Sequence, residues 1–287
     1  MRKVVMTAVM SLCMFTTLSM GTSHANAETT GSFLVEEGVP PLGANDPSCR
    51  PDDARPVPVV LVPGTFESMA QNWVELAPIL KKKGYCVYSL NYGVTTAGYS
   101  TGPIEESAME LKIFIDQVLA HTGAEKVSIV GHSQGGMMPR YYLKFLGGAD
   151  KVDDLIGLAP SHHGTEGLAG LGYATGVGAE ILKECTACRQ QLVGSAFLEN
   201  LNAGDETPGK VSYTNVATKI DEVIVPYTSS FLTESKDVSN ITLQDYYPFD
   251  LAGHTVLAHD LNAFQFVYDA LGYSGPADPE RAVGGWW

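Results

Sequence analysis

Residues 127–136 read Val-Ser-Ile-Val-Gly-His-Ser-Gln-Gly-Gly, and this stretch decides the fold. An apolar, β-branched run leads directly into G-x-S-x-G, and the pattern from 137 to 146 predicts a helix. A strand, a sharp turn and a helix in this order hold a serine in a strained backbone conformation, with its hydroxyl exposed above the end of a sheet. Gly131 and Gly135 suit the turn because side chains at these positions would collide across it. Ser133 is therefore a candidate nucleophile.

The sequence around this stretch alternates between strand patterns and helix patterns. Strands are predicted at 57–62, 85–90, 155–159, 211–216 and 241–244, and helices at 72–83, 103–120 and 259–271. This order predicts an α/β fold with a mostly parallel sheet and helices on both faces. The first helix should be capped by Asn72, with a kink or a late start at Pro78. No linker or repeat divides the chain, so we predict one domain over 28–287.

The segment from 164 to 204 differs in character from the rest. It is Gly-rich and apolar as far as Gly178, and two helical patterns and a C-x-x-C motif follow. Such an insertion before the sheet resumes is a candidate lid or part of a substrate pocket. The alternative for its Gly-rich half is a mobile surface excursion.

The first 27 residues have the layout of a secretory signal peptide. Two basic residues precede an apolar stretch from 4 to 20, and small residues end in Ala25-Asn26-Ala27. We predict cleavage after Ala27 and a secreted mature protein. An N-terminal membrane anchor fits less well because the stretch is short and contains Ser and Thr. A lipidated Cys13 also fits less well, because Leu12 stands where a small residue is wanted.

The composition limits the partners of the chain. The formal net charge of −14 disfavours binding to nucleic acid or to anionic membrane surfaces. Hydrophobic residues make up 45% of the chain, which is enough for a sizeable core. No carboxylate cluster is typical of a calcium site, so we predict no metal and no cofactor. We expect a monomer without stable membrane insertion.

Removal of the signal peptide would leave four cysteines in an oxidising compartment, namely Cys49, Cys86, Cys185 and Cys188. Three pairings are possible. We favour Cys49 with Cys86, which bracket a strand-helix unit, and Cys185 with Cys188, which form a local C-x-x-C. The alternative for the second pair is a redox or metal role, but two thiols without further ligands make a poor zinc site.

A serine hydroxyl is a poor nucleophile unless a base removes its proton, and histidine has the suitable pKa. The histidine in turn needs a carboxylate on its other nitrogen. In an open parallel sheet these partners follow the serine along the chain, on loops after later strands, with the acid before the histidine. Asp221 follows the strand at 211–216 and His254 follows the strand at 241–244, so we predict them as acid and base.

Each of these assignments has alternatives. Glu222 and Asp245 compete for the acid, and His259 competes for the base, although it begins the final helix. The remaining histidines are predicted to be structural or to line the pocket: His121, His132, His162 and His163.

The oxyanion that forms at the acyl carbon needs hydrogen-bond donors. We predict the backbone N–H of Gln134, which directly follows the nucleophile at a helix start. Thr65, in the loop after the strand at 57–62, is the second predicted donor, through its N–H and its hydroxyl. Without the nucleophile turn, Pro63-Gly64-Thr65 would be an ordinary turn. The candidate walls of the acyl pocket are Phe66, His162, Leu168, Leu171, Ile224, Val225 and Leu257.

Several segments together resemble the secreted triacylglycerol lipases of the α/β-hydrolase fold, namely bacterial class 2 lipases and fungal lipase B of the Candida antarctica type. These segments are Val62-Pro63-Gly64-Thr65, Asn72-Trp73, Ser133-Gln134-Gly135-Gly136, Lys151-Val152-Asp153, Ala159-Pro160, Gly164-Thr165, Gln190-Gln191, Gly194-Ser195-Ala196 and Asp221-Glu222-Val223-Ile224-Val225-Pro226. They extend over most of the mature chain, and the set is more specific than any single segment.

The resemblance implies an α/β-hydrolase fold with esterase or lipase activity and a disulfide like Cys49–Cys86. It also implies the catalytic triad Ser133, Asp221 and His254 and an oxyanion hole of Thr65 and Gln134. Two features depart from the pattern. The chain reads Ala252-Gly253-His254, where lipase B has its histidine before an Ala-Gly pair, and the second cysteine pair has no counterpart there.

The sequence therefore predicts a secreted serine carboxylester hydrolase, in the first place a triacylglycerol lipase, that forms an acyl-enzyme on Ser133. Its partner would be a lipid or another ester, with an oil–water interface as a place of action. A short-chain esterase or a polyester hydrolase would use the same triad, and a rate that rises above the solubility limit of a triglyceride would mark the lipase. A secreted binding protein would keep the fold but would not react with a fluorophosphonate.

Overall fold

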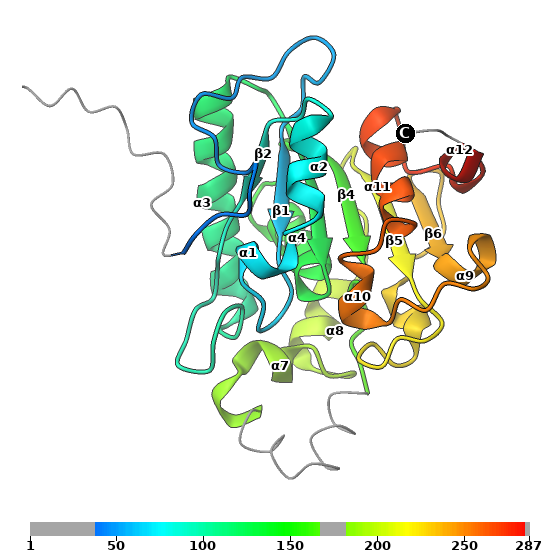
Figure 1. Ribbon diagram of the computed structural model, residues 1–287. Coiled ribbons are helices and arrows are strands. Elements are labelled where there is room, and N and C mark those ends of the chain that lie inside the picture. Colours follow the sequence, from blue (N-terminus) through cyan, green and yellow to red (C-terminus); the bar gives the residue numbers. More distant parts are fainter. Residues whose placement is uncertain (1–37, 167–181, 285–287) are drawn as a thin grey trace, which may run out of the picture. The chain divides into compact units, whose positions relative to one another are not determined.

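Six parallel strands form one sheet within residues 38–166 and 182–284, the residues that the computed structural model describes (Figure 1). The spatial order of the strands is β2-β1-β3-β4-β5-β6, and every neighbouring pair is parallel. The strands are β1 (Val59–Val62), β2 (Val87–Ser89), β3 (Val127–His132), β4 (Val152–Leu158), β5 (Ser212–Ala217) and β6 (Val238–Thr242). The predicted parallel α/β sheet is confirmed.

Helices cover both faces of this sheet (Figure 1). The longer ones are α2 (Leu76–Lys82), α3 (Ile104–Thr122), α4 (Gln134–Phe145), α8 (Ala196–Asn202) and α11 (Ala263–Gly272). The shorter ones are α1 (Met69–Asn72), α7 (Thr186–Gln190), α9 (Leu243–Tyr246), α10 (His254–Leu257), α12 (Pro279–Gly284) and the 3-10 turn η1 (Tyr227–Ser230). The apolar faces of α3, α4 and α8 share one core, and those of α2 and α11 share the other.

The strand β1 illustrates how the sequence specifies this layering. Val60 and Val62 belong to the core with α3 and α4, whereas Val59 and Leu61 belong to the core with α2 and α11. Successive side chains of a strand point to opposite faces, so a strand that is covered on both faces is apolar at nearly every position. The continuous apolar run of β1 predicted this strand, whereas β4 begins at Val152, three residues before the predicted run of 155–159, because two aspartates interrupt its apolar pattern.

The predicted helix from 72 to 83 is divided in the structure, and the prediction that Asn72 begins it was wrong. Ser68 caps α1 in a capping box with Gln71, and Asn72 ends this helix. The Asn72 side chain is used elsewhere, because its Oδ1 accepts a hydrogen bond from the N–H of Gly64 at 2.7 Å. The second helix begins late, as Pro78 predicted, and the proline lies in the first turn, where its missing N–H leaves no intrahelical bond unmade.

The C-terminal elements also differ from the prediction. The last strand is β6 and ends at Thr242, so Leu243 and Gln244 lie in α9 instead. His259 lies between two helices, and α11 begins only at Ala263. At this start, Asp260 Oδ1 accepts a hydrogen bond from the N–H of Ala263 at 2.7 Å.

Both favoured disulfides are present. Cys49–Cys86 joins the irregular lead-in to the residue before β2, and Cys185–Cys188 closes the first turn of α7. The predicted signal peptide lies outside the described residues, as does 167–181 of the candidate lid, whose described remainder forms α7 and α8. Among the helices of the described ranges, none is long and apolar enough to cross a bilayer.

Candidate active site

The predicted nucleophile lies at a strained turn between β3 and α4. Ser133 has φ 54° and ψ −121°, a conformation that costs a non-glycine residue about 1–3 kcal/mol. Two glycines make this turn sterically possible. A Cβ on Gly131 would lie 1.9 Å from the carbonyl oxygen of Gly135, and a Cβ on Gly135 would lie 2.1 Å from that of Val62. The turn therefore presents the serine at the carboxyl end of a central strand.

The predicted acid and base are in direct contact. His254 Nδ1 lies 2.9 Å from Asp221 Oδ2, and the side chains are 6% and 0% exposed. The other carboxylate oxygen, Oδ1, accepts hydrogen bonds from the backbone N–H groups of Val223 at 2.9 Å and Ile224 at 2.7 Å. Three donors thus surround the carboxylate, and they hold it and the imidazole in one orientation.

The alternative residues have other partners. Glu222 Oε2 accepts from the backbone N–H of His254 at 3.0 Å, so it holds the main chain of the histidine and does not contact its ring. A Cβ on the preceding Gly253 would lie 2.5 Å from this same oxygen, so a side chain there would require the Glu222 carboxylate to move. Asp245 pairs with a surface lysine, and His259 pairs with Glu75.

The two predicted oxyanion donors have free backbone N–H groups. Neither Thr65 N nor Gln134 N has a partner within the described part of the chain. The Gln134 N–H lies at the start of α4, where helix geometry leaves the first N–H groups unpaired. The Thr65 hydroxyl accepts a hydrogen bond from Gln191 Nε2 at 3.0 Å.

Ser133, His254 and Thr65 line a cavity of about 320 Å³, whereas Gln134 and Asp221 are not among its lining residues. A volume of this size is typical of small-molecule sites. Its lining residues are Thr65, Phe66, Glu67, His132, Ser133, Cys188, Gln191, Val223, Ile224, His254 and Thr255. Of the predicted walls, Phe66 and Ile224 line this cavity, whereas Val225 does not.

Two further predicted wall residues are used elsewhere in the fold. His162 is buried and bonds Asn215 Oδ1 through Nε2 at 2.8 Å, and burial lowers the pKa of its ring. Leu257 packs in the core beside α11. The predicted Leu168 and Leu171 lie outside the described residues.

His132 and Glu67 form a second pair beside the histidine. His132 Nδ1 lies 2.9 Å from Glu67 Oε2, and its Nε2 lies 3.1 Å from the carbonyl oxygen of His254. Burial raises the pKa of Glu67, but the hydrogen bond from His132 and the nearby imidazoles outweigh it, so the pKa is lowered overall. The Glu67 carboxylate and the carbonyl oxygen of His254 thus hold the His132 ring from opposite sides. No local sequence pattern predicts this pair, because its two residues are 65 positions apart.

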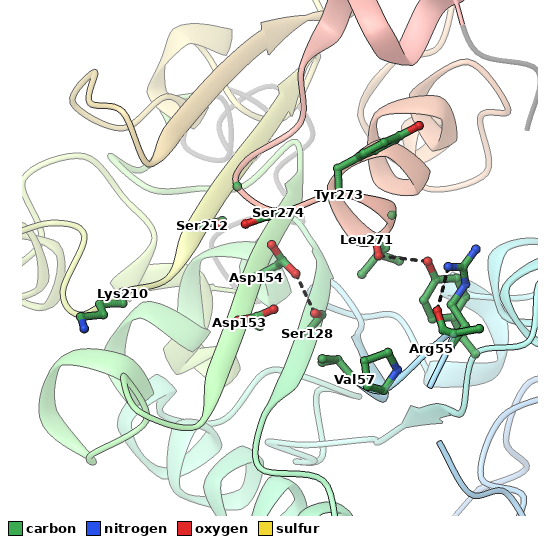
Figure 2. A pocket seen from close by; sticks show the side chains of 15 residues that line it. Arg55, Val57, Ser128, Asp153, Asp154, Lys210, Ser212, Leu271, Tyr273 and Ser274 are labelled. Carbon is green, nitrogen blue, oxygen red and sulfur yellow. Dashed lines mark hydrogen bonds between the residues drawn. The ribbon is translucent and has the colours of Figure 1, made fainter. Parts of the chain in front are cut away.

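A second, larger cavity of about 380 Å³ lies at the opposite end of the strands, where β3, β4 and β5 begin (Figure 2). Asp154 and Ser128 line it, and the serine hydroxyl donates to Asp154 Oδ2 at 2.8 Å. It lacks a histidine and a strained serine. The smaller cavity, which contains Ser133 and His254, is therefore the candidate active site. Within the two described ranges, no group of three or more His, Cys, Asp or Glu side chains could hold a metal ion.

The fold and the turn define an α/β hydrolase: a parallel sheet with a serine on a sharp strand-to-helix turn. Among solved structures, lipase B of Aspergillus fumigatus is similar, with a TM-score of 0.65 and 25% identity over 78% of this chain and 54% of that chain. A Bacillus licheniformis lipase in its propeptide form shares the fold, with a TM-score of 0.62 and 20% identity over 81% of this chain and 54% of that chain.

The chain belongs to the class 2 lipase family, whose sequence model matches residues 56–267. It is 30% identical over 226 residues to lipase B of Pseudozyma antarctica, which covers 75% of this chain and 57% of that protein. It is also 36% identical over 91 residues to a triacylglycerol lipase of Pseudarthrobacter phenanthrenivorans, covering 29% of this chain and 27% of that protein. The chain thus spans little more than half of lipase B, and the predicted family is confirmed.

Proposed function

We propose that the protein is a serine carboxylester hydrolase that acts on acylglycerols or similar esters. The observation that carries the proposal is that Ser133, with its strained backbone, and His254, whose Nδ1 contacts Asp221, line the same cavity. Membership in the class 2 lipase family supports the same reaction and the same class of substrate.

The proposed reaction follows from the donors and acceptors around the cavity. Ser133 Oγ attacks the acyl carbon while His254 Nε2 takes its proton, and Asp221 stabilises the imidazolium through Nδ1. The oxyanion accepts hydrogen bonds from the N–H of Gln134 and from the N–H and hydroxyl of Thr65. The imidazolium then gives its proton to the leaving alcohol. In the second half of the reaction, water attacks the acyl-enzyme while His254 takes its proton, and the acid is released as the proton returns to Ser133.

An apolar loop beside the site supports action at an oil–water interface. Phe249 and Leu251 are 95% and 82% exposed, and both lie in the loop that leads to His254. Asp250 between them braces the loop, because its carboxylate accepts from Ala252 N at 2.8 Å and from an asparagine of the next loop. Large apolar side chains on a braced loop suit insertion into a lipid surface.

The proposal extends to location and assembly. Two disulfides in the described chain accord with an oxidising compartment, and the predicted signal peptide would take the protein there. We propose a secreted monomer with no bound nucleic acid and no stable membrane insertion.

The test is hydrolysis of p-nitrophenyl butyrate and palmitate by the parent and by three variants. Ser133→Ala and His254→Ala should each lower kcat by at least about 10³-fold, because triad members act as a unit. The control His259→Ala, which alters the rival histidine, should stay within about threefold. Activity that survives in Ser133→Ala would refute the mechanism. A folded parent that neither hydrolyses the esters nor reacts with a fluorophosphonate would favour a binding protein.

A further inference from the structure

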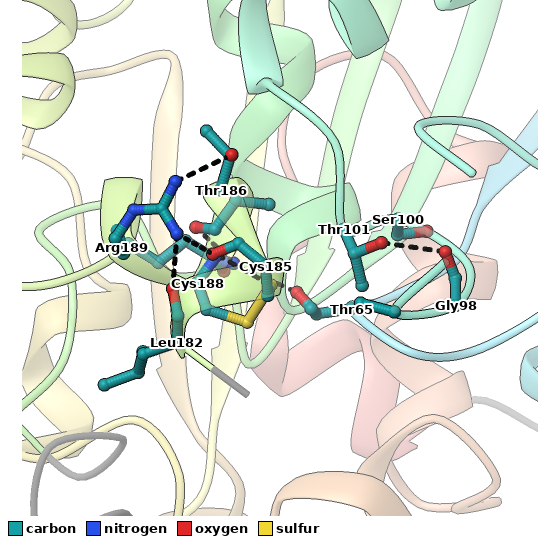
Figure 3. The surroundings of a disulfide bond; sticks show 12 residues. Thr65, Gly98, Ser100, Thr101, Leu182, Cys185, Thr186, Cys188 and Arg189 are labelled. Atoms are coloured by element: carbon teal, nitrogen blue, oxygen red, sulfur yellow. Dashed lines mark hydrogen bonds between the residues drawn. A yellow bond between two sulfur atoms is a disulfide. The ribbon is translucent and has the colours of Figure 1, made fainter. Parts of the chain in front are cut away.

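The helix α7 beside the candidate site is too short to be stable by itself. It has five residues, and helices below about 12 residues are marginal in water. The Cys185–Cys188 disulfide closes its first turn, and the N–H of Cys188 donates to Cys185 Sγ at 3.0 Å. Figure 3 shows the disulfide beside Thr65, with Arg189 bonded to Thr186 on the same turn. Cys188 also lines the candidate active site.

The residue that ends this helix contacts the predicted oxyanion threonine. The N–H of Gln191 donates to the carbonyl of Ala187 at 3.0 Å, so its position is fixed by the α7 backbone. Its side-chain Nε2 donates to Thr65 Oγ1 at 3.0 Å and to the same carbonyl at 3.2 Å. Its Oε1 accepts from Ser161 Oγ at 2.9 Å.

These contacts determine the direction of the Thr65 hydroxyl proton. The carbonyl of Ala187 can only accept, so the amide nitrogen of Gln191 must face it and the threonine. Thr65 Oγ1 therefore receives a hydrogen bond from Gln191, and its own O–H cannot point back along that bond. The described residues offer this O–H no other acceptor, so its proton stays available to the cavity that it lines.

We propose that the Cys185–Cys188 disulfide is a positioning element of the oxyanion hole. It fixes α7, α7 holds the Gln191 amide against Thr65, and this contact keeps the threonine proton available to a negatively charged acyl oxygen. The inference rests on the proposed ester hydrolysis, and it assigns to the second cysteine pair a role in the rate of that reaction.

The first experiment compares the loss of each disulfide, using the soluble ester p-nitrophenyl butyrate. Cys185→Ala/Cys188→Ala should lower kcat about tenfold with KM within about twofold, because a misplaced oxyanion donor weakens transition-state binding. The matched control, Cys49→Ala/Cys86→Ala, removes a disulfide remote from the cavity and should keep kcat within about twofold. Circular dichroism and thermal melting establish that the variants are folded. Equal kcat in parent and Cys185→Ala/Cys188→Ala would overturn the proposal.

The second experiment tests whether the effect passes through the threonine hydroxyl. Thr65→Val keeps the backbone N–H and removes the hydroxyl, so loss of the Cys185–Cys188 disulfide in this background should change kcat by less than about twofold. The same tenfold loss in both backgrounds would mean that the disulfide acts elsewhere, and the proposal would be wrong.

A third variant leaves the disulfide intact and so avoids a failure to fold. Gln191→Glu places an acceptor where the donor was, so the Thr65 proton turns toward the new carboxylate and kcat should fall about tenfold or more. Unchanged kcat in Gln191→Glu would contradict the proposal. The activity of the parent distinguishes failure of the proposed ester hydrolysis from failure of the proposed positioning role. An inactive parent without fluorophosphonate labelling refutes the ester hydrolase, whereas an active parent with unaltered variants refutes the positioning role alone.

Discussion

At the scale of single residues, the pair of Glu67 and His132 braces the candidate active site. Glu67 Oε2 and the carbonyl oxygen of His254 bind opposite nitrogens of the His132 ring, whose centroid lies 5.0 Å from that of His254. The Glu67 side chain is only 20% exposed, and that of His132 is 2% exposed. A charged hydrogen bond in such surroundings should contribute measurably to stability.

We expect Glu67→Gln to destabilise the protein by about 1–3 kcal/mol at pH 7, measured by urea unfolding. Because the folded-state pKa of Glu67 is lowered from 4.5, its contribution is present above pH 4.5 and is lost as the pH falls through the lower folded value. The difference between parent and variant should therefore shrink below pH 4.5. The control Glu75→Gln removes the exposed pair with His259 and should cost less than about 1 kcal/mol. A pH-independent difference for Glu67→Gln would contradict the argument.

The proposed triad was predicted from the order of strands and loops, with Asp221 preferred to Glu222 although the pattern admits both. Asp221 and Glu222 are adjacent acids after the same strand, and the sequence offers both. The structure separates them by direction, since one bonds the imidazole and the other bonds the backbone of His254. Gln191 lay in a segment that carried the family resemblance, yet its contact with Thr65 joins loops 126 residues apart. Such pairings depend on tertiary geometry, which local patterns do not contain.

At the scale of elements, the loop between α9 and α10 should determine how strongly the protein binds to the surface of an insoluble substrate. Phe249→Ser/Leu251→Ser should lower hydrolysis of emulsified tributyrin about tenfold, because two exposed apolar anchors are lost. Hydrolysis of soluble p-nitrophenyl butyrate should stay within about twofold. Leu42→Ser is the matched control, since Leu42 is also 82% exposed but lies in the lead-in, before β1. Equal losses on both substrates would mean that the loop supports the site and does not bind lipid.

Helices and strands were predicted correctly where the spacing of apolar residues alone indicates their type and position. The long helix α3 and the strand β3 were located to within two residues, because α3 has apolar residues at every third or fourth position and β3 begins with an apolar, β-branched run. The cap predicted at Asn72 and the helix start predicted at His259 were wrong. The Asn72 side chain instead accepts from the N–H of Gly64, and the Asp260 side chain accepts from the N–H of Ala263, where α11 begins. These bonds override the periodicity, and no window of hydrophobicity reveals them.

At the scale of the whole molecule, the alternation of strands and helices predicted the parallel sheet but not the order of its strands. The chain forms β1 and β2 side by side and then places β3 on the other side of β1. This crossover puts β3 near the middle of the sheet, with Ser133 at its carboxyl end, where loops after β5 and β6 can reach it. Local sequence does not specify such an arrangement, because it depends on which apolar faces pack together.

At the end of the sheet where the strands begin, the buried carboxyl of Asp154 makes the stability of the folded protein depend on pH. Asp154 lines the larger cavity but is only 6% exposed, and burial raises its pKa to about 7, with the Ser128 hydrogen bond acting against this rise (Figure 2). In the unfolded chain the same carboxyl titrates near 3.8. The protonated form therefore stabilises the folded protein below pH 3.8, and this contribution is lost as the pH rises through about 7.

Asp154→Asn should remove this dependence, because an amide keeps the contact with Ser128 and does not ionise. At about 1.4 kcal/mol per pH unit, the variant should be more stable than the parent by up to about 4 kcal/mol at pH 8, and the two should converge near pH 4. Urea unfolding at intervals between these pH values measures the difference. Asp153→Asn is the matched control, because the Asp153 side chain, next to Asp154 in the chain, is 47% exposed and pairs with Lys126. This variant should change stability by less than about 1 kcal/mol. If parent and Asp154→Asn lose stability in parallel from pH 4 to 8, the carboxyl is hydrated through its cavity and ionises without cost.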